Sequence, residues 1–251
     1  MSNSRFLYVA NWKMELSFKQ AILFYKKHQN GFARLSDDGE ADIIVCPSFE
    51  ALHPLAELFK TSAVFLGAQD CASHKYGAYT GQVSVQSLSE IGCAYCLVGH
   101  SERRNYFFET DKDVAEKVDQ LLLVDIQPII CVGETRQDYD VGNSFTAVGK
   151  QVSAVCELVQ EQKKSAHLIF AYEPVWAVGT NKVTSNEHIE NMFEFICATA
   201  FRCSPEVTIT LLYGGSVDVQ SINQLKQING LGGFLIGRAS RDFQKFEKIV
   251  T

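Results

Sequence analysis

Short, nearly continuous apolar runs of strand length recur along the whole chain. Runs without polar alternation are typical of parallel strands that are covered on both faces. Segments with helical periodicity separate them, so the pattern predicts eight strand–helix units. The predicted strands are Phe6–Lys13, Ala41–Ser48, Ala63–Asp70, Tyr95–Ser101, Gln127–Glu134, His167–Pro174, Thr208–Gly215 and Gly232–Ala239. The predicted helices are Ser17–Arg34, Glu50–Lys60, Val85–Ile91, Asp111–Val124, Asn143–Gln162, Asn186–Arg202, Asp218–Gln227 and Arg241–Ile249.

The segment Asn186–Arg202 illustrates the helical pattern. Apolar residues follow one another at steps of three and four, which places them on one face of a helix. Ser185 or Asn186 is expected to cap its start. The residues of this stripe are Ile189, Met192, Phe193, Ile196, Cys197 and Ala200.

Eight alternations within 251 residues fit a closed (β/α)8 barrel, an α/β fold of the TIM-barrel type. Such a barrel commonly occupies one domain of about 250 residues, so residues 1–251 are predicted to form a single domain. A doubly wound open sheet is the structural alternative that periodicity alone leaves open.

Composition and charge narrow the range of partners. The chain is 46% hydrophobic and 21% charged, which is ordinary for a globular protein with a large core. Its net charge is −6 and it has no basic run, so no nucleic-acid partner is expected.

The positions of the cysteines indicate in which cellular compartment the protein is expected. Most of the eight cysteines lie within apolar patterns, as Cys46 and Cys131 do, and are expected to be reduced core residues. Cys93 and Cys96 have CxxC spacing, but a second pair at zinc-ribbon spacing is missing. No apolar run reaches the roughly 18 residues of a membrane span, and the first residues contain no apolar signal core. A cytoplasmic protein that is not embedded in a membrane is therefore expected.

Polar residues gather where the predicted strands end. In a barrel of parallel strands, that edge is the active face. Glu173 is the most informative of them, because it ends an apolar run and a loop that could close over it follows. The full set is Asn11, Lys13, Gln69, His100, Glu102, Glu134, Glu173 and Ser216.

Four segments carry a resemblance to a known family. They are Asn11–Met14 (NWKM), Val98–Arg104 (VGHSERR), Ala171–Thr180 (AYEPVWAVGT) and Tyr213–Val217 (YGGSV). Together, and in this order, they resemble the signature motifs of the triosephosphate isomerases. The resemblance covers nearly the whole chain and implies the interconversion of dihydroxyacetone phosphate and glyceraldehyde 3-phosphate, without a metal or cofactor.

The resemblance also implies roles for individual residues. Glu173 matches the catalytic base and His100 the electrophile that serves the carbonyl oxygens. Lys13 matches the cation that stabilises the enediolate, with Asn11 as its hydrogen-bonding neighbour. Positions 11 and 13 of one strand would point to the same side, toward the barrel mouth. Glu102 matches a carboxylate near the lysine and histidine, with a salt bridge to a nearby arginine as the alternative.

The phosphate group has no matched arginine clamp, so it is expected to rest on backbone N–H groups. The matched positions are Gly179, Ser216, Gly237 and Arg238. The matched lid runs from about Pro174 to Thr184, and Tyr213, Ser216 and Ser185 are candidates for its latch. The family is typically a homodimer, and the loop Asp70–Gln82 resembles the arm that reaches the partner subunit.

Five positions depart from the family pattern. Arg238 stands where a second glycine is usual, and we expect its side chain to turn outward while its backbone N–H still serves the phosphate. Asn181 replaces a glycine of the lid, and Phe108 replaces a common glycine. Gly232 replaces a common aspartate, and Gln82 a common glutamate near the dimer contact.

Two other functions are weighed against this one. Another phosphosugar isomerase of the barrel type would share the phosphate loops but would not need Glu173, His100 and Lys13 together. A non-catalytic barrel would be favoured by the loss of any of these three residues, and all three are present.

Overall fold

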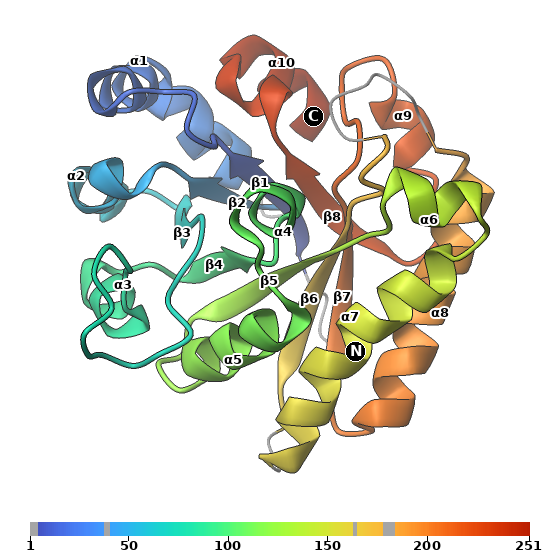
Figure 1. Cartoon of the computed structure of the whole chain (residues 1–251). Coiled ribbons are helices and arrows are strands. Elements are labelled where there is room, and N and C mark those ends of the chain that lie inside the picture. The colour runs from blue at the N-terminus through green and yellow to red at the C-terminus, as the bar shows by residue number, and fades with distance from the viewer. Residues whose placement is uncertain (1–4, 38–40, 163–164, 178–183) are drawn as a thin grey trace.

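The computed structural model describes residues 5–37, 41–162, 165–177 and 184–251. Its centre is a closed barrel of parallel strands, in which each strand pairs with the next and the last pairs with the first (Figure 1). The strands are β1 (Phe6–Asn11), β2 (Ala41–Cys46), β3 (Phe65–Ala68), β4 (Tyr95–Val98), β5 (Gln127–Val132), β6 (His167–Tyr172), β7 (Thr208–Tyr213) and β8 (Leu231–Ile236). The predicted (β/α)8 barrel is therefore confirmed, and the open sheet is excluded.

Helices surround the barrel on its outer side (Figure 1). The main ones are α1 (Phe18–Asp37), α2 (Phe49–Phe59), α3 (Val85–Ile91), α5 (Asp111–Leu122), α7 (Ser144–Glu161), α8 (Asn186–Cys203) and α10 (Phe243–Val250). Shorter ones are α4 (Ser101–Phe107), α6 (Arg136–Asp140), α9 (Ile222–Leu225) and the 3₁₀ helix η1 (Arg238–Arg241). Among the helices of these described ranges, none has the length and apolar character that crossing a membrane requires.

The strands are mostly apolar because each one contributes to two cores. Along β1, Leu7 and Val9 belong to a cluster inside the barrel, whereas Tyr8 and Ala10 belong to the layer between the barrel and the helices. Successive side chains of a strand point to opposite faces, so both faces must be apolar when both are buried. This arrangement explains why the apolar runs show no alternation.

Three short helices were not predicted, and one predicted helix is much shorter than expected. Of the segment 218–227, only the four residues of α9 are helical. Asp218 Oδ1 accepts the backbone N–H groups of Gln220 at 2.8 Å and Ser221 at 2.9 Å. This local hydrogen bonding favours a turn over a helix at that point. The three unpredicted helices α4, α6 and η1 all follow the carboxyl end of a strand.

Candidate active site

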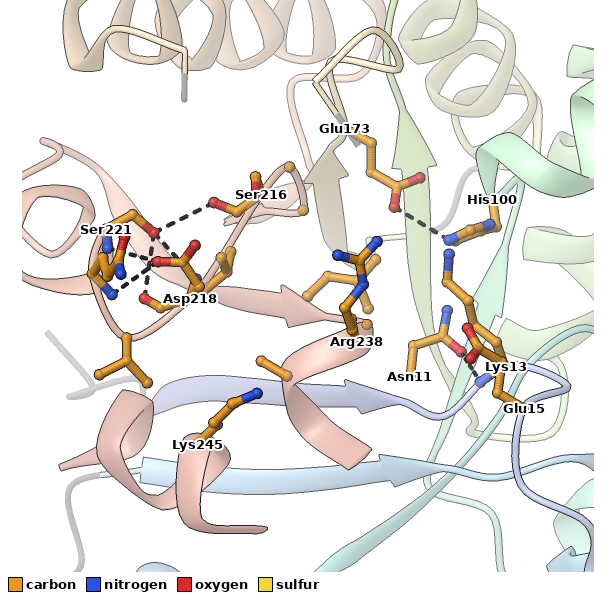
Figure 2. A pocket seen from close by; sticks show the side chains of 18 of the residues that line it. Asn11, Lys13, Glu15, His100, Glu173, Ser216, Asp218, Ser221, Arg238 and Lys245 are labelled. Carbon is orange, nitrogen blue, oxygen red and sulfur yellow. Dashed lines mark hydrogen bonds and ion pairs between the residues drawn. The ribbon is translucent and has the colours of Figure 1, made fainter. Parts of the chain in front are cut away.

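A pocket of about 770 Å³ lies at the carboxyl ends of the strands. It brings together most of the residues that the sequence singles out, from β1 and the segments after β1, β4, β6, β7 and β8 (Figure 2). The predicted site residues that line it are Asn11, Lys13, His100, Glu102, Glu173, Ser216, Gly237 and Arg238. Residues far apart in sequence therefore converge on one cavity, as the barrel topology requires.

Glu173 is a buried carboxylate that follows β6 directly. Its backbone N–H donates to the carbonyl oxygen of Val132 at 2.8 Å, which extends the β5–β6 pairing by one residue. The neighbouring backbone approaches it closely: a Cβ atom built on Gly133 would lie 1.8 Å from the carbonyl oxygen of Glu173. On the other side, a Cβ atom on Gly214 would lie 2.8 Å from its Cγ. Only glycine fits at these two positions, and the carboxylate is held in one place.

His100 faces this carboxylate. Its Nε2 atom lies 3.3 Å from Glu173 Oε1, and both side chains are almost fully buried. His100 also caps α4, because its Nδ1 accepts the backbone N–H of Glu102 at 3.2 Å. A ring nitrogen that accepts an N–H carries no proton itself, so in the neutral imidazole the proton is on Nε2. That proton points to Glu173. The helix α4 thus begins directly after His100.

Lys13 is oriented by an ion pair and by two hydrogen bonds to its backbone. Its Nζ lies 2.6 Å from Glu102 Oε1. Its N–H donates to Asn11 Oδ1 at 3.0 Å, and Gln69 Nε2 donates to its carbonyl oxygen at 2.9 Å. Of the two alternatives for Glu102, the structure pairs this carboxylate with the lysine.

The prediction that Asn11 and Lys13 point the same way because they alternate along one strand is wrong. β1 ends at Asn11, and Lys13 has a left-handed backbone with φ 52°. Strand alternation therefore does not apply at position 13. Both side chains still reach the pocket, because the turn after β1 directs the lysine there.

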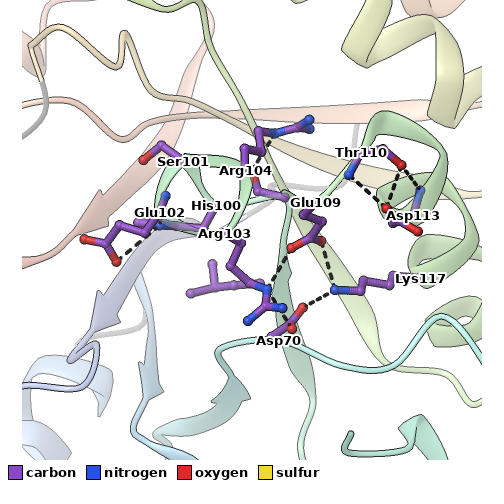
Figure 3. Close-up of polar contacts among 12 residues, drawn as sticks. Asp70, His100, Ser101, Glu102, Arg103, Arg104, Glu109, Thr110, Asp113 and Lys117 are labelled. Atoms are coloured by element: carbon purple, nitrogen blue, oxygen red, sulfur yellow. Dashed lines mark hydrogen bonds and ion pairs between the residues drawn. The ribbon is translucent and has the colours of Figure 1, made fainter. Parts of the chain in front are cut away.

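A group of four charges, of which Asp70, Glu109 and Lys117 are buried, supports the segment that carries His100 and Glu102 (Figure 3). Arg103 Nε lies 2.8 Å from Asp70 and 2.7 Å from Glu109. Lys117 Nζ lies 2.7 Å from Asp70 and 2.9 Å from Glu109. Burial raises the pKa of Asp70, and the two acids raise the pKa of Lys117 against the effect of burial. The group links the loop after β3, α4 and α5 into one unit.

The loops after β7 and β8 form the other side of the pocket. Gly237, directly after β8, faces the side chain of Lys13, because a Cβ atom built on this glycine would lie 3.5 Å from Lys13 Cε. Arg238 begins η1, and its φ angle is not positive. A non-glycine residue therefore meets no backbone conflict at this position.

Comparison with known proteins assigns this arrangement to a family. A family model described as triosephosphate isomerase matches residues 6–251. The chain belongs to the triosephosphate isomerase family. It is 36% identical to the triosephosphate isomerase of Endomicrobium trichonymphae over 97% of both chains, and 35% identical to that of Aquifex aeolicus over 98% of both. It is 37% identical to that of Thermus thermophilus over 96% of both chains.

The structure shows how two of the residues that depart from the family pattern, Arg238 and Phe108, are placed. The side chain of Arg238 is exposed, but it lines the pocket and its guanidinium extends over it in Figure 2. The expectation that it turns away is wrong, because the start of η1 directs it across the pocket. Phe108 adopts the left-handed conformation that a glycine favours, with φ 57°, as the C-cap of α4. Its side chain is 84% exposed.

Parts of the lid lie outside the described residues. These include Gly179, the expected phosphate contact on the lid, and Asn181. Of the latch candidates, Tyr213 is buried and its hydroxyl has no hydrogen-bond partner among the described residues. Ser185 caps α8 by accepting the N–H of His188 at 3.3 Å, which confirms its predicted capping role. The latch role of Tyr213, Ser216 and Ser185 stays a prediction.

Glu134 was noted in the sequence as a residue at a strand end, but without a role. The structure buries it completely and surrounds it with the start of the lid. Its Oε1 accepts Trp176 Nε1–H at 2.8 Å and the Tyr172 hydroxyl at 3.1 Å. Its carbonyl oxygen accepts the N–H of Val175 at 3.1 Å. Burial raises the pKa of Glu134. The only sequence signal for Glu134 was its place after Gly133 at the end of an apolar run. This signal does not indicate which residues fold over Glu134.

Metal ligation has no obvious place in this arrangement. Within the described ranges, no three His, Cys, Asp or Glu side chains are grouped as metal ligands are.

Proposed function

We propose that this protein is a triosephosphate isomerase that interconverts dihydroxyacetone phosphate and D-glyceraldehyde 3-phosphate. Membership of the family and the consistent names of its relatives support the reaction. The single observation that carries the mechanism is the 3.3 Å approach of His100 Nε2 to Glu173 Oε1 in a pocket that also contains Lys13.

Glu173 is the proposed base. Its carboxylate takes a proton from C1 of dihydroxyacetone phosphate, and the electron pair of that C–H bond moves into the C1–C2 bond as the carbonyl oxygen becomes negative. The same carboxylate then returns a proton to C2, which yields the aldehyde. One base can serve both carbons because it is held rigidly beside the two of them.

His100 and Lys13 are proposed to stabilise the enediolate. The Nε2–H of His100 donates to the oxygen that becomes negative and moves a proton between the two oxygens. Lys13 adds a positive charge close to the same oxygens, and a fixed charge in a site sheltered from water is worth far more than in bulk solvent. Asn11 and Glu102 act through Lys13, by fixing its backbone and its ammonium group.

The phosphate group is proposed to rest on the backbone N–H groups at Ser216, Gly237 and Arg238, with Gly179 of the lid completing the site. Closure of the lid would exclude water and suppress loss of phosphate from the enediolate. Tyr213 and Ser185 are proposed to hold the closed lid.

A coupled assay of both directions, run beside two matched variants, tests this function. Glu173→Asp moves the carboxylate back by one methylene and is expected to lower kcat by at least about 100-fold. Glu187→Asp makes the same change at an exposed position of α8 and is expected to leave kcat within about twofold. A parent protein without activity would refute the function, and equal activity of both variants would refute the assignment of the base.

We further propose a homodimer. Aromatic and sulfur-containing side chains are exposed on the turn after β1, on the loop Asp70–Gln82 and on α4, and large exposed apolar side chains are typical of an interaction surface when they lie together. They are Met14 (92% exposed), Tyr76 (72%), Tyr79 (44%), Tyr106 (71%) and Phe107 (65%). Light scattering after size-exclusion chromatography should give twice the mass of one chain, and a mass of one chain would refute the dimer.

A cytoplasmic location is proposed from the cysteines. All eight are free thiols, and six of them are buried in the core. Unpaired thiols in this number are typical of a reducing compartment. Fractionation of the source cells, with the protein found outside the soluble cytoplasmic fraction, would overturn this proposal.

A further inference from the structure

Arg238 starts from a fixed point on the wall of the pocket. The carbonyl oxygen of Gly237 accepts both the N–H of Ser240 at 3.0 Å and its hydroxyl at 2.7 Å, which closes the turn after β8. The preceding residue, Gly237, faces the side chain of Lys13. The direction in which Arg238 leaves the backbone is thereby restricted.

From this point the arginine side chain extends over the cavity. It lines the same pocket as Lys13 and Ser216, and in Figure 2 its guanidinium stands between Ser216 on one side and Asn11 and Lys13 on the other. This is the side of the pocket where the backbone N–H groups expected to hold a phosphate lie.

We propose that the guanidinium of Arg238 binds the phosphate group of the substrate directly, in addition to the backbone N–H groups. This inference rests on the proposed function, because it assumes a phosphorylated substrate in this pocket. A guanidinium presents its N–H groups in a planar fork that matches two phosphate oxygens, and such charge-assisted pairs are stronger than neutral hydrogen bonds. A glycine at position 238 would supply a backbone N–H alone.

Two consequences follow from an added charge at an exposed position. The pocket binds phosphate more tightly than it would without the guanidinium. This gain applies to inorganic phosphate and to phosphorylated trioses alike, because the guanidinium interacts with the anion and not with the reacting carbons. Binding also weakens with rising salt concentration, because solvent-exposed charges are screened over about 10 Å at 0.1 M salt.

The test compares Arg238→Gln with Lys248→Gln. Both variants replace one exposed cation with glutamine, but Lys248 lies in the last turn of α10 and outside the residues that line the pocket. Titration calorimetry with inorganic phosphate and steady-state kinetics with both trioses are measured for each. Arg238→Gln should weaken phosphate binding and raise KM by about threefold to tenfold, and Lys248→Gln should change either by less than about twofold.

A third variant separates the effect of the bidentate guanidinium geometry from the effect of the positive charge. Arg238→Lys keeps the positive charge but loses the bidentate geometry, so its phosphate affinity should lie between those of the parent and Arg238→Gln. The parent and Lys248→Gln should also lose more affinity between 20 mM and 200 mM salt than Arg238→Gln does.

The possible results separate this proposal from the proposed function. An active parent whose phosphate affinity and KM are equal in Arg238→Gln and Lys248→Gln overturns the role of Arg238 and leaves the isomerase intact. Tighter phosphate binding by Arg238→Gln also overturns it, because the arginine would then obstruct the site. An inactive parent that fails to bind phosphate overturns both.

Discussion

The carbonyl oxygen of Glu173 occupies the space in which a side chain of residue 133 would begin. A Cβ atom on Gly133 would lie only 1.8 Å from that oxygen, closer than two such atoms can approach. The contact joins the loop after β5 to the end of β6 at the residue that we assign as the base. Rigid packing of the backbone, and not only the contact between its carboxylate and His100, fixes where the carboxylate lies.

Gly133→Ala should therefore displace Glu173 and lower kcat by at least about 100-fold, because a shift of about 1 Å at a catalytic group costs that much. Gly149→Ala is the matched control, since this glycine lies within α7 and its added Cβ would meet only the ring of Phe195, at 3.1 Å. The coupled assay measures both variants. Unchanged kcat in Gly133→Ala would show that the close contact does not position the base.

The ion pairs of the buried residues Lys117, Asp70 and Glu109 are expected to matter for stability more than any surface pair. Lys117→Met would leave the carboxylates of Asp70 and Glu109 buried beside Arg103 alone, at a cost of about 3–5 kcal/mol in the free energy of unfolding. Lys112→Met removes a lysine that is 83% exposed in its ion pair and should cost less than about 1 kcal/mol. Denaturant unfolding at pH 7 distinguishes them, and equal losses would contradict this view of the network.

Glu134 should make the folded protein less stable as the pH rises, and comparison with Glu134→Gln should reveal this effect. Burial raises its folded-state pKa above the ordinary value of 4.5. A group whose folded pKa is raised contributes stability that is complete below its unfolded pKa and is lost as the pH rises through the folded pKa. Glu134→Gln keeps the shape and an oxygen acceptor for Trp176 and Tyr172 without ionising.

The stability of Glu134→Gln relative to the parent should therefore increase as the pH rises above about 4.5, the ordinary pKa of the group. Urea unfolding of both proteins at several pH values measures this difference. A difference that stays constant over the range, or that moves in favour of the parent, would show that Glu134 is not held with a raised pKa.

The sequence predicts the residues at strand ends but not the contacts between distant strands. The positions of Glu173 and His100 followed from apolar runs and strand ends, because a barrel brings those ends together. The left-handed turn at Lys13 and the contact between Gly133 and Glu173 could not be predicted, since both depend on packing between strands that are distant in sequence. The helix α6 did have a local signal, the capping box of Thr135 and Asp138, which the apolar periodicity of this five-residue segment does not reveal.

Phe108 offers a test of backbone strain. A non-glycine residue in the left-handed region costs about 1 kcal/mol or more, and this side chain is mostly exposed. Phe108→Gly should be more stable than Phe108→Ala by about 1 kcal/mol, because both remove the ring and only glycine relieves the backbone. Thermal unfolding of the two variants measures the difference. Equal stability would mean that the C-cap of α4 is not strained.

The most direct test of the central claim, that one carboxylate moves a proton between the two carbons, is isomerisation in D₂O followed by proton NMR. We predict that the parent converts dihydroxyacetone phosphate into glyceraldehyde 3-phosphate with deuterium at C2 in part of the product, because a proton held on a carboxylate exchanges with solvent in competition with its return to carbon. Glu173→Asp should form the same labelled product at least about 100-fold more slowly. Rapid product formation by Glu173→Asp at the rate of the parent would contradict the assignment of Glu173 as the base.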